Sequence, residues 1–286
     1  MDQALQVAVS ILANMAVVVL VSAGLAVVFG FMGVINFAQG QFVMLGAYAL
    51  LAVERHGAGL LVGVVVASAV TAAAGAVTYQ FLVRPLKGRL LETILVTWGL
   101  GLVLTQSIIL EFGPVSSNIP PPFGALHIGR YSIAWYSVAI IAIAAMMMAG
   151  LYLLFTRTKF GLRANASIQV PEMARALGIR TERTNMTTFG LGCGLAGCAG
   201  ALVAPLYAIT PELGDLFTAT SYLSVAVGGP LPVTGVVTAG GLLGGAQGAT
   251  ATIWNSLVGD VVLLLAAMVL LRLYGSGISA QWRRRV

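Results

Sequence analysis

The chain is a succession of about eight apolar runs, each about 20 residues long and separated from the next by a short polar break. A helix of this length matches the ~30 Å hydrocarbon core of a bilayer. Of the 286 residues, 59% are hydrophobic and 8% are charged, so there is too little polar surface to cover a water-soluble globule. The sequence therefore predicts an all-α polytopic membrane protein in which residues 1–286 form a single transmembrane domain.

Basic residues are concentrated in three parts of the sequence. They fall at 84–89, at 157–183 and at 272–285, and only Arg55 and Arg130 lie elsewhere. An excess of Lys and Arg marks the cytoplasmic loops of membrane proteins. We therefore expect these segments and the carboxyl terminus in the cytoplasm, and the amino terminus in the periplasm. The net charge of +6 then reflects topology and does not indicate binding to nucleic acid.

Two apolar stretches contain residues that a lipid-facing helix does not carry. Residues 24–48 include several glycines and three amides, and residues 219–248 include a Gly-Gly-Pro break. Irregular backbone and amides are tolerated at membrane depth only where protein or a water-filled cavity covers them. We therefore expect two broken or re-entrant segments, the second being a pair of half-helices followed by a full span at about 257–271. The residues expected to line a central pathway are Asn36, Gln39, Gln41, Gly228 and Gly229. Hydrogen bonding between helices in a dry core is the alternative for the three amides.

A threonine pair marks the span expected at 90–110. Thr93 and Thr97 are spaced i, i+4 and therefore share one side of a helix. In the first alternative, their hydroxyls form hydrogen bonds with carbonyls one turn earlier or with a neighbouring helix. In the second, the hydroxyls line the pathway. Both alternatives are open at this point.

Two segments are expected outside the membrane on the periplasmic side. Residues 111–130 contain four prolines and therefore cannot be helical throughout. Glu212 and Asp215, in the sequence TPELGD, are expected in an acidic outer loop.

The longest charged segment, at about 156–185, is expected in the cytoplasm. Pro171 suits the first turn of a helix, Glu172 favours its positive end, and Gly178 can end it in the left-handed conformation. Met173, Ala176 and Leu177 form an apolar stripe on this helix. The pattern predicts an amphipathic helix of about two turns, which lies on lipid headgroups or docks on another protein.

The sequence contains no pattern that indicates catalysis. It has no Walker A, HExxH, CxxC or G-x-S-x-G motif, and Cys193 and Cys198 have the character of small packing residues. The two acidic residues associated with spans, Glu92 and Asp260, fall near helix ends rather than at the midplane. We therefore expect no cofactor or metal in this chain, and we expect the energy for transport to come from another subunit.

Four stretches together resemble the LivH-type permeases of ABC importers for branched-chain amino acids, to which urea permeases are close relatives. They are MGVINFAQGQFVMLGAY from Met32, ETILVTWGLGLVL from Glu92, the segment from Gly161 to Ile179, and AVGG…GVVTAGGLLGG from Ala226. They occur in the same order and with similar spacing over nearly the whole chain. That family usually has His, and often Glu, at the positions of Gln39 and Gln41. A role based on charge is therefore not expected there in this chain.

The resemblance implies a permease subunit of the bacterial inner membrane. Its partners would be a second, homologous permease, two cytoplasmic ATPase subunits that bind ATP and Mg, and a periplasmic substrate-binding protein. The cytoplasmic segment resembles the coupling helix that docks in a groove of an ATPase, and the positions carried over are Arg163, Glu172, Met173, Ala176, Leu177 and Gly178. The implied substrates are branched-chain or other hydrophobic amino acids, with urea, short amides or aromatic acids as the alternative. A self-sufficient channel or secondary carrier is the second alternative.

Overall fold

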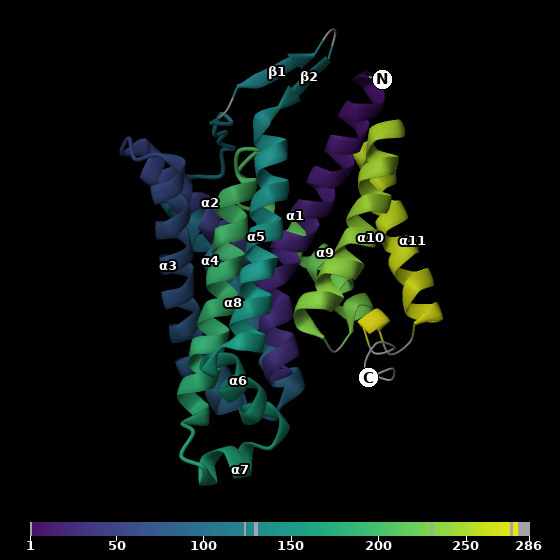
Figure 1. The fold of residues 1–286 in the computed structure, drawn as a ribbon. Helices are drawn as coiled ribbons and strands as arrows, with labels where there is room; N and C mark the ends of the chain where they lie inside the picture. The colour runs from purple at the N-terminus through teal and green to yellow at the C-terminus, as the bar shows by residue number, and fades with distance from the viewer. Residues whose placement is uncertain (1, 123, 129–130, 230, 275–276, 280–286) are drawn as a thin grey trace.

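The computed structural model describes residues 2–122, 124–128, 131–229, 231–274 and 277–279, and in these residues it is a helical bundle with one short β-hairpin (Figure 1). Arg130, Pro230 and residues 283–285, which the sequence places in loops or in the basic tail, lie outside the described residues. The all-α membrane architecture is as predicted.

Six helices of the described residues are long and apolar enough to cross a membrane. They are α1 (Asp2–Met32), α3 (Leu60–Thr78, extended by the helical turns η1, Tyr79–Val83, and η2, Arg84–Leu86), α4 (Leu90–Phe112), α5 (Trp135–Arg157), α8 (Thr181–Val203) and α11 (Ser256–Leu273). The pair α9 (Leu213–Gly228) and α10 (Pro232–Ile253) is bent by 116° and can count as one more span. The number of candidate spans is therefore six or seven rather than about eight.

The main reason for the lower number is α2 (Gln39–Arg55), which has 17 residues and so extends only about 25 Å. It follows a non-helical stretch, residues 33–38, within the segment that the sequence predicted to be broken. This prediction is confirmed.

The two ends of the bundle differ in character (Figure 1). The amino terminus lies near one end together with the hairpin of β1 (Ala125–Ile128) and β2 (Tyr131–Ala134), which pair antiparallel with Ile128 opposite Tyr131. We call it the hairpin end. The opposite end, which we call the basic end, carries α6 (Lys159–Gln169) and α7 (Pro171–Ala176). The described residues of the segment at 111–130 are non-helical beyond Phe112, as its prolines predicted.

Helices α1 and α8 form the centre of the bundle. In the most apolar 18-residue stretch of each helix, 78% of the residues are buried in α1 and 72% in α8. The corresponding values for α3, α4, α5 and α11 are 17–28%. The outer helices expose apolar side chains such as Leu61, Leu110 and Leu257, which suits contact with lipid.

Glycines allow three helices to pack closely against α8. A Cβ at Gly192 would overlap a Val28 side chain of α1, one at Gly197 would overlap Thr71 of α3, and one at Gly200 would overlap the Val43 carbonyl of α2. Small residues permit this approach because apolar burial alone does not drive association between helices in lipid. The Gly-rich run of α8 is therefore a packing surface.

This packing predicts the effect of a single methyl group. Gly200→Ala should lower the free energy of unfolding by about 1–3 kcal/mol because the α2 backbone must move away. Gly150→Ala on α5 is the matched control: a Cβ there meets nothing within 4 Å, so the helix should be unchanged or more stable by up to about 1 kcal/mol. Denaturant titration of both variants in micelles measures the difference, and equal stability of the two would contradict the packing role.

Candidate functional site

Two helices, α2 and α9, begin inside the bundle rather than at its ends. Their first turns are in backbone contact, because a Cβ at Gly40 would overlap the Gly214 carbonyl and one at Gly214 would overlap the Gly40 carbonyl. Helix amino termini carry unpaired N–H groups and a partial positive charge. Two such termini together make a small polar region within an apolar bundle. We call this region, where the first turns of α2 and α9 meet at Gly40 and Gly214, the half-helix junction.

The depth of the junction follows from its neighbours. The Gln39 side chain lies beside Gly24 of α1, and Gly24 in turn contacts Gly192 and Ala196 of α8. These residues lie well inside their helices. From the junction α2 runs to the hairpin end, where Tyr48 packs on Phe112 with ring centroids 5.0 Å apart. Helix α9 runs the other way, toward the basic end.

The segment that carries Glu212 and Asp215 differs from the sequence prediction. The chain is non-helical over residues 204–212, directly before α9, so Glu212 and Asp215 lie at the start of a half-helix and not in an outer loop. Pro205 and Pro211 bound this stretch, and proline removes the N–H that a continuing helix needs. Their spacing is the sequence signal that could have located the break.

One hydrogen bond joins the two half-helices. Gln41 Nε2 donates to Asp215 Oδ1 over 2.8 Å. Gln41 is buried and its side chain also packs against Gly101 of α4. Asp215 is exposed in the described chain, so the junction has one buried side and one open side. The carboxylate was missed by sequence reasoning, which expected only uncharged groups here.

The stretch before α2 is fixed by two further polar contacts. The Phe37 N–H donates to Thr97 Oγ1 over 3.0 Å, and the Ala38 N–H donates to Asn36 Oδ1 over 3.2 Å. The stretch that carries Asn36 therefore lies beside Thr97, and Gln41 lies beside Gly101 one turn further along α4. That Asn36, Gln41 and Thr97 line one substrate pathway stays a prediction.

Several buried amide atoms of the junction have no hydrogen-bond partner among the described residues. Gln39 is fully buried, and neither its Nε2 nor its Oε1 has a partner. Asn36 Nδ2 and Gln41 Oε1 are also buried without a partner. An unsatisfied buried polar group costs about 1–3 kcal/mol. Such groups are rare in native proteins, so their clustering marks a place suited to a polar ligand or to water.

Thr93 and Thr97 make the local bonds that one alternative described. Each hydroxyl donates over 2.8 Å to the carbonyl four residues earlier, Thr93 to Arg89 and Thr97 to Thr93. Thr97 alone also accepts from the broken stretch. Thr93 lines a separate cavity of about 250 Å³ nearer the basic end.

Gly228 and Gly229 lie at the basic end, about 21 Å along α9 from Gly214. Gly228 packs on Gly235 of α10, and Gly229 has a φ of 81°, which suits only glycine at this turn. The predicted break at this point is confirmed, but it is the bend between α9 and α10 and not part of the half-helix junction.

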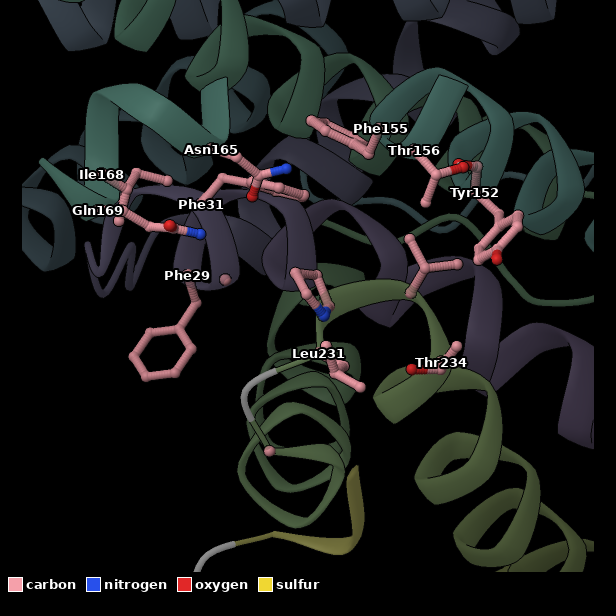
Figure 2. Close-up of a pocket in the computed structure, with 14 residues that line it drawn as sticks. Phe29, Phe31, Tyr152, Phe155, Thr156, Asn165, Ile168, Gln169, Leu231 and Thr234 are labelled. Atoms are coloured by element: carbon pink, nitrogen blue, oxygen red, sulfur yellow. The ribbon is translucent and has the colours of Figure 1, made fainter. Parts of the chain in front are cut away.

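A cavity of about 630 Å³ adjoins this bend (Figure 2). Side chains of α5 and α6, among them Phe155 and Asn165, lie on one side of it, and Leu231 and Thr234 lie on the other (Figure 2). Phe155 stacks on Phe31 of α1 with centroids 3.9 Å apart. The cavity therefore separates the segment that carries α6 from the bend between α9 and α10.

The charged segment that the sequence predicted in the cytoplasm forms two short helices, α6 and α7, instead of one. Helix α6 is capped by Thr158, whose hydroxyl accepts from the Gly161 N–H, and α7 ends at Ala176 because Leu177 already leaves helical geometry. Gly178 takes a φ of 80°, and its N–H donates to the Arg175 carbonyl. The left-handed end is as predicted, and the six residues of α7 are close to the predicted length of about two turns.

The apolar stripe of this segment is exposed. Met173 is 59% and Leu177 is 74% exposed, and Ala174 is the buried anchor of α7. Leu162 and Val170, which the sequence analysis did not single out, extend the apolar surface. The other predicted positions, Arg163, Glu172, Ala176 and Gly178, are exposed as well. We call this surface the α6–α7 face.

A bundle of apolar helices with two half-helices meeting at buried amides has the architecture of a membrane permease. Residues 7–272 match the family described as the branched-chain amino acid transport system permease component, and the chain belongs to this family. It is a transport subunit and not an enzyme.

The named relatives are similar over most of their length. The chain is 29% identical to the "probable branched-chain amino acid transport permease protein LivH" of Methanocaldococcus jannaschii, over 79% of this chain and 74% of the relative. It is 27% identical to the high-affinity branched-chain amino acid transport system permease protein BraD of Pseudomonas aeruginosa, over 88% of each chain. For LivH of Escherichia coli the identity is 25% over 91% and 90%. No solved structure matches the chain.

The bond across the junction predicts how Gln41→Glu responds to pH. The substitution places a second carboxylate beside Asp215, and two like charges at this distance repel. The folded protein then binds a proton more readily than the unfolded chain, so the free energy of unfolding should fall as pH rises from about 5 to 8. Denaturant titration at several pH values measures the slope.

The double variant Gln41→Glu with Asp215→Asn is the matched control, since it exchanges the two groups and keeps one donor and one acceptor. It should remove most of the added pH dependence. A slope that is the same in the single and double variants would contradict the contact.

Proposed function

We propose that the chain forms half of the translocation path of an ATP-driven ABC importer for branched-chain or other hydrophobic amino acids. Family membership supports the transport role, and the relatives named for branched-chain amino acids support the substrate class. The observation that carries the proposal for this chain is the half-helix junction, with its buried amides and the carboxylate of Asp215.

The junction offers complementary groups for a zwitterion. The carboxylate of Asp215 and the unpartnered Oε1 of Gln41 accept from an α-ammonium group. The amino termini of α2 and α9 and the amide of Gln39 donate to an α-carboxylate. This revises the expectation of an uncharged site, since an ammonium group favours a carboxylate partner. Urea and short amides carry no charge and do not need Asp215, which makes them the weaker alternative.

The open side of the junction supports a paired permease. Glu212, Asp215, Leu216 and Ala219 are all exposed and follow one face of α9. A carboxylate facing lipid at depth costs about 2.5–3.5 kcal/mol or more. We infer that a second, homologous permease and the aqueous path cover this face. Residues 1–286 would then act as one transmembrane domain of the pair.

The α6–α7 face is the proposed contact with a cytoplasmic ATPase subunit, which binds the ATP and Mg. Its exposed Met173 and Leu177 suit an apolar groove, and Arg163 and Glu172 suit a polar rim. Motion of this face would reach the bend between α9 and α10 across the 630 Å³ cavity, because α6 and the bend line opposite sides of it. Helix α9 would carry that motion to the junction.

The proposed setting is the bacterial inner membrane, with the basic end in the cytoplasm and the hairpin end in the periplasm. Nine basic residues support this orientation, namely Arg84, Lys87, Arg89, Arg157, Lys159, Arg163, Arg175, Arg180 and Arg183. A periplasmic binding protein would deliver the substrate to the hairpin end.

Reconstitution tests the proposed class of transporter. Proteoliposomes that hold this chain, its partner permease and the ATPase subunits should take up radiolabelled leucine only when ATP, Mg and the binding protein are supplied. Vesicles with this chain alone should show no uptake. Leucine flux through the chain alone would overturn the ABC assignment in favour of a channel or secondary carrier.

The role of the junction predicts the effect of Asp215→Asn in this system. Loss of a charge-assisted hydrogen bond to substrate costs about 1.5–3 kcal/mol, so leucine uptake should fall by about 10- to 100-fold. Association with the ATPase, measured by co-purification, should not change. The control is Glu111→Gln, an exposed carboxylate at the end of α4, which should transport normally. Unchanged uptake in Asp215→Asn would remove Asp215 from the path.

The α6–α7 face makes a separate prediction. Leu177→Asp should lower ATPase association by about tenfold or more, because a charge replaces an apolar side chain in the docking surface. Leu177→Met keeps the apolar surface and should associate normally. Co-purification from membranes measures both variants. Normal assembly of Leu177→Asp would contradict the proposed contact.

A further inference from the structure

A second polar cluster lies away from the half-helix junction, among α1, α10 and α11. Asn14 Nδ2 donates to the Gly244 carbonyl over 3.0 Å and to Gln247 Oε1 over 3.2 Å. Gln247 Nε2 donates to Asp260 Oδ1 over 2.7 Å. The chain of bonds runs from α1 through α10 to Asp260, which lies in the second turn of α11.

A cavity of about 470 Å³ adjoins this cluster. It has the size of a small-molecule site. Its polar lining comes from Asn14, Tyr207, Thr220, Gln247, Ser256 and Asp260, and its apolar walls include Val17, Leu216 and Leu264. The cavity exists because α9 begins inside the bundle, so no helix continues from its first turns toward the hairpin end. Tyr207, from the non-helical stretch before α9, lies on this side.

The charge of the side chains that line the cavity is negative. Asp260 is its carboxylate, no Lys, Arg or His is among its lining residues, and no salt bridge of the described residues includes Asp260. Gln247 satisfies one carboxylate oxygen, and the side chain is still exposed. Asp260 lies near the end of a candidate span, and an ionisable group there that lacks a basic partner is a candidate for a functional site.

The chemistry of the lining selects among cations. A divalent metal requires several oxygen ligands of high charge, and the described residues hold no group of three or more His, Cys, Asp or Glu that could bind one. A primary ammonium group needs one carboxylate and neutral acceptors, which Asp260, Tyr207 and Thr220 supply. The apolar walls favour an aliphatic body attached to that group.

We propose that this cavity binds a primary ammonium group carried on an aliphatic body, with Asp260 as its counter-charge. The ammonium group can belong to a free amine or aliphatic amino acid at the hairpin end, or to the headgroup of an aminophospholipid. Neither Gln41 nor Asp215 lines this cavity, although Leu216 and Ala219 of the exposed α9 face do.

Cysteine protection tests the site directly. Ser256 lines the cavity and is exposed, so Ser256→Cys in a Cys198→Ala background provides a reactive thiol, while Cys193 is fully buried. The full chain is placed in phosphatidylcholine nanodiscs and alkylated with a maleimide at pH 7, where isopentylamine is protonated. Isopentylamine should slow alkylation severalfold, and isopentanol, which lacks the ammonium group, should not. Equal protection by both would overturn the proposal.

Asp260→Asn separates ligand binding from a structural role of the cluster. The amide oxygen still accepts from Gln247, so the bond between α10 and α11 can persist while the charge is lost. The concentration of isopentylamine needed for protection should rise about tenfold or more. Glu111→Gln, which removes an exposed carboxylate at the end of α4 that does not line the cavity, should leave protection unchanged. Undiminished protection in Asp260→Asn would show that the carboxylate binds no ammonium group.

Nanodisc composition distinguishes the two sources of the ammonium group. If the lipid headgroup occupies the cavity, phosphatidylethanolamine should slow alkylation without added amine, and Asp260→Asn should abolish the difference between the two lipids. If the site takes free amines only, the lipid should have no effect and isopentylamine should still protect. Absence of both effects would overturn the proposal.

Discussion

The structure depends on the requirement that every backbone polar group at membrane depth be covered or paired. Two helices that begin inside the bundle expose unpaired N–H groups there, together with the non-helical stretches that precede them. These stretches are tolerated because α1 and α8 lie beside them and because the first turns of α2 and α9 contact one another at Gly40 and Gly214. The same contact concentrates polar groups at one point of an otherwise apolar protein.

Close approach of backbones makes this arrangement possible. Gly192, Gly197 and Gly200 let α8 receive α1, α3 and α2 on different faces, because a Cβ at these positions would overlap Val28, Thr71 or the Val43 carbonyl. Because lipid is as apolar as the helix surface, such packing contributes most of the association between helices in a bilayer. The glycines are therefore part of the reason that a half-helix can end in the interior and still be held there.

Two acidic side chains of the bundle, Asp215 and Asp260, have the same kind of hydrogen-bond partner. Asp215 and Asp260 each accept a hydrogen bond from a glutamine amide, Gln41 and Gln247 respectively, over 2.8 Å and 2.7 Å. In neither case does an Arg or Lys of the described residues neutralise the carboxylate. A glutamine amide orients a carboxylate but leaves its charge in place, so both sites keep a negative charge for another cation. The salt bridges among the described residues, such as Arg84 with Glu182, lie at the basic end, where water screens them.

The sequence by itself determined the membrane class, the family resemblance and the first broken segment, because apolar length, charge placement and interrupted runs are local properties of a chain. It also located the bend at Gly229 and the left-handed Gly178, since a glycine beside a proline or at a helix end restricts the backbone locally. Only the tertiary structure placed Asp215 against Gln41, 174 positions apart, and separated Gly228 from the junction. The sequence distinguishes a loop from a half-helix poorly, because both are short and polar at their start. Which of them enters the bundle is decided by the helices that surround it.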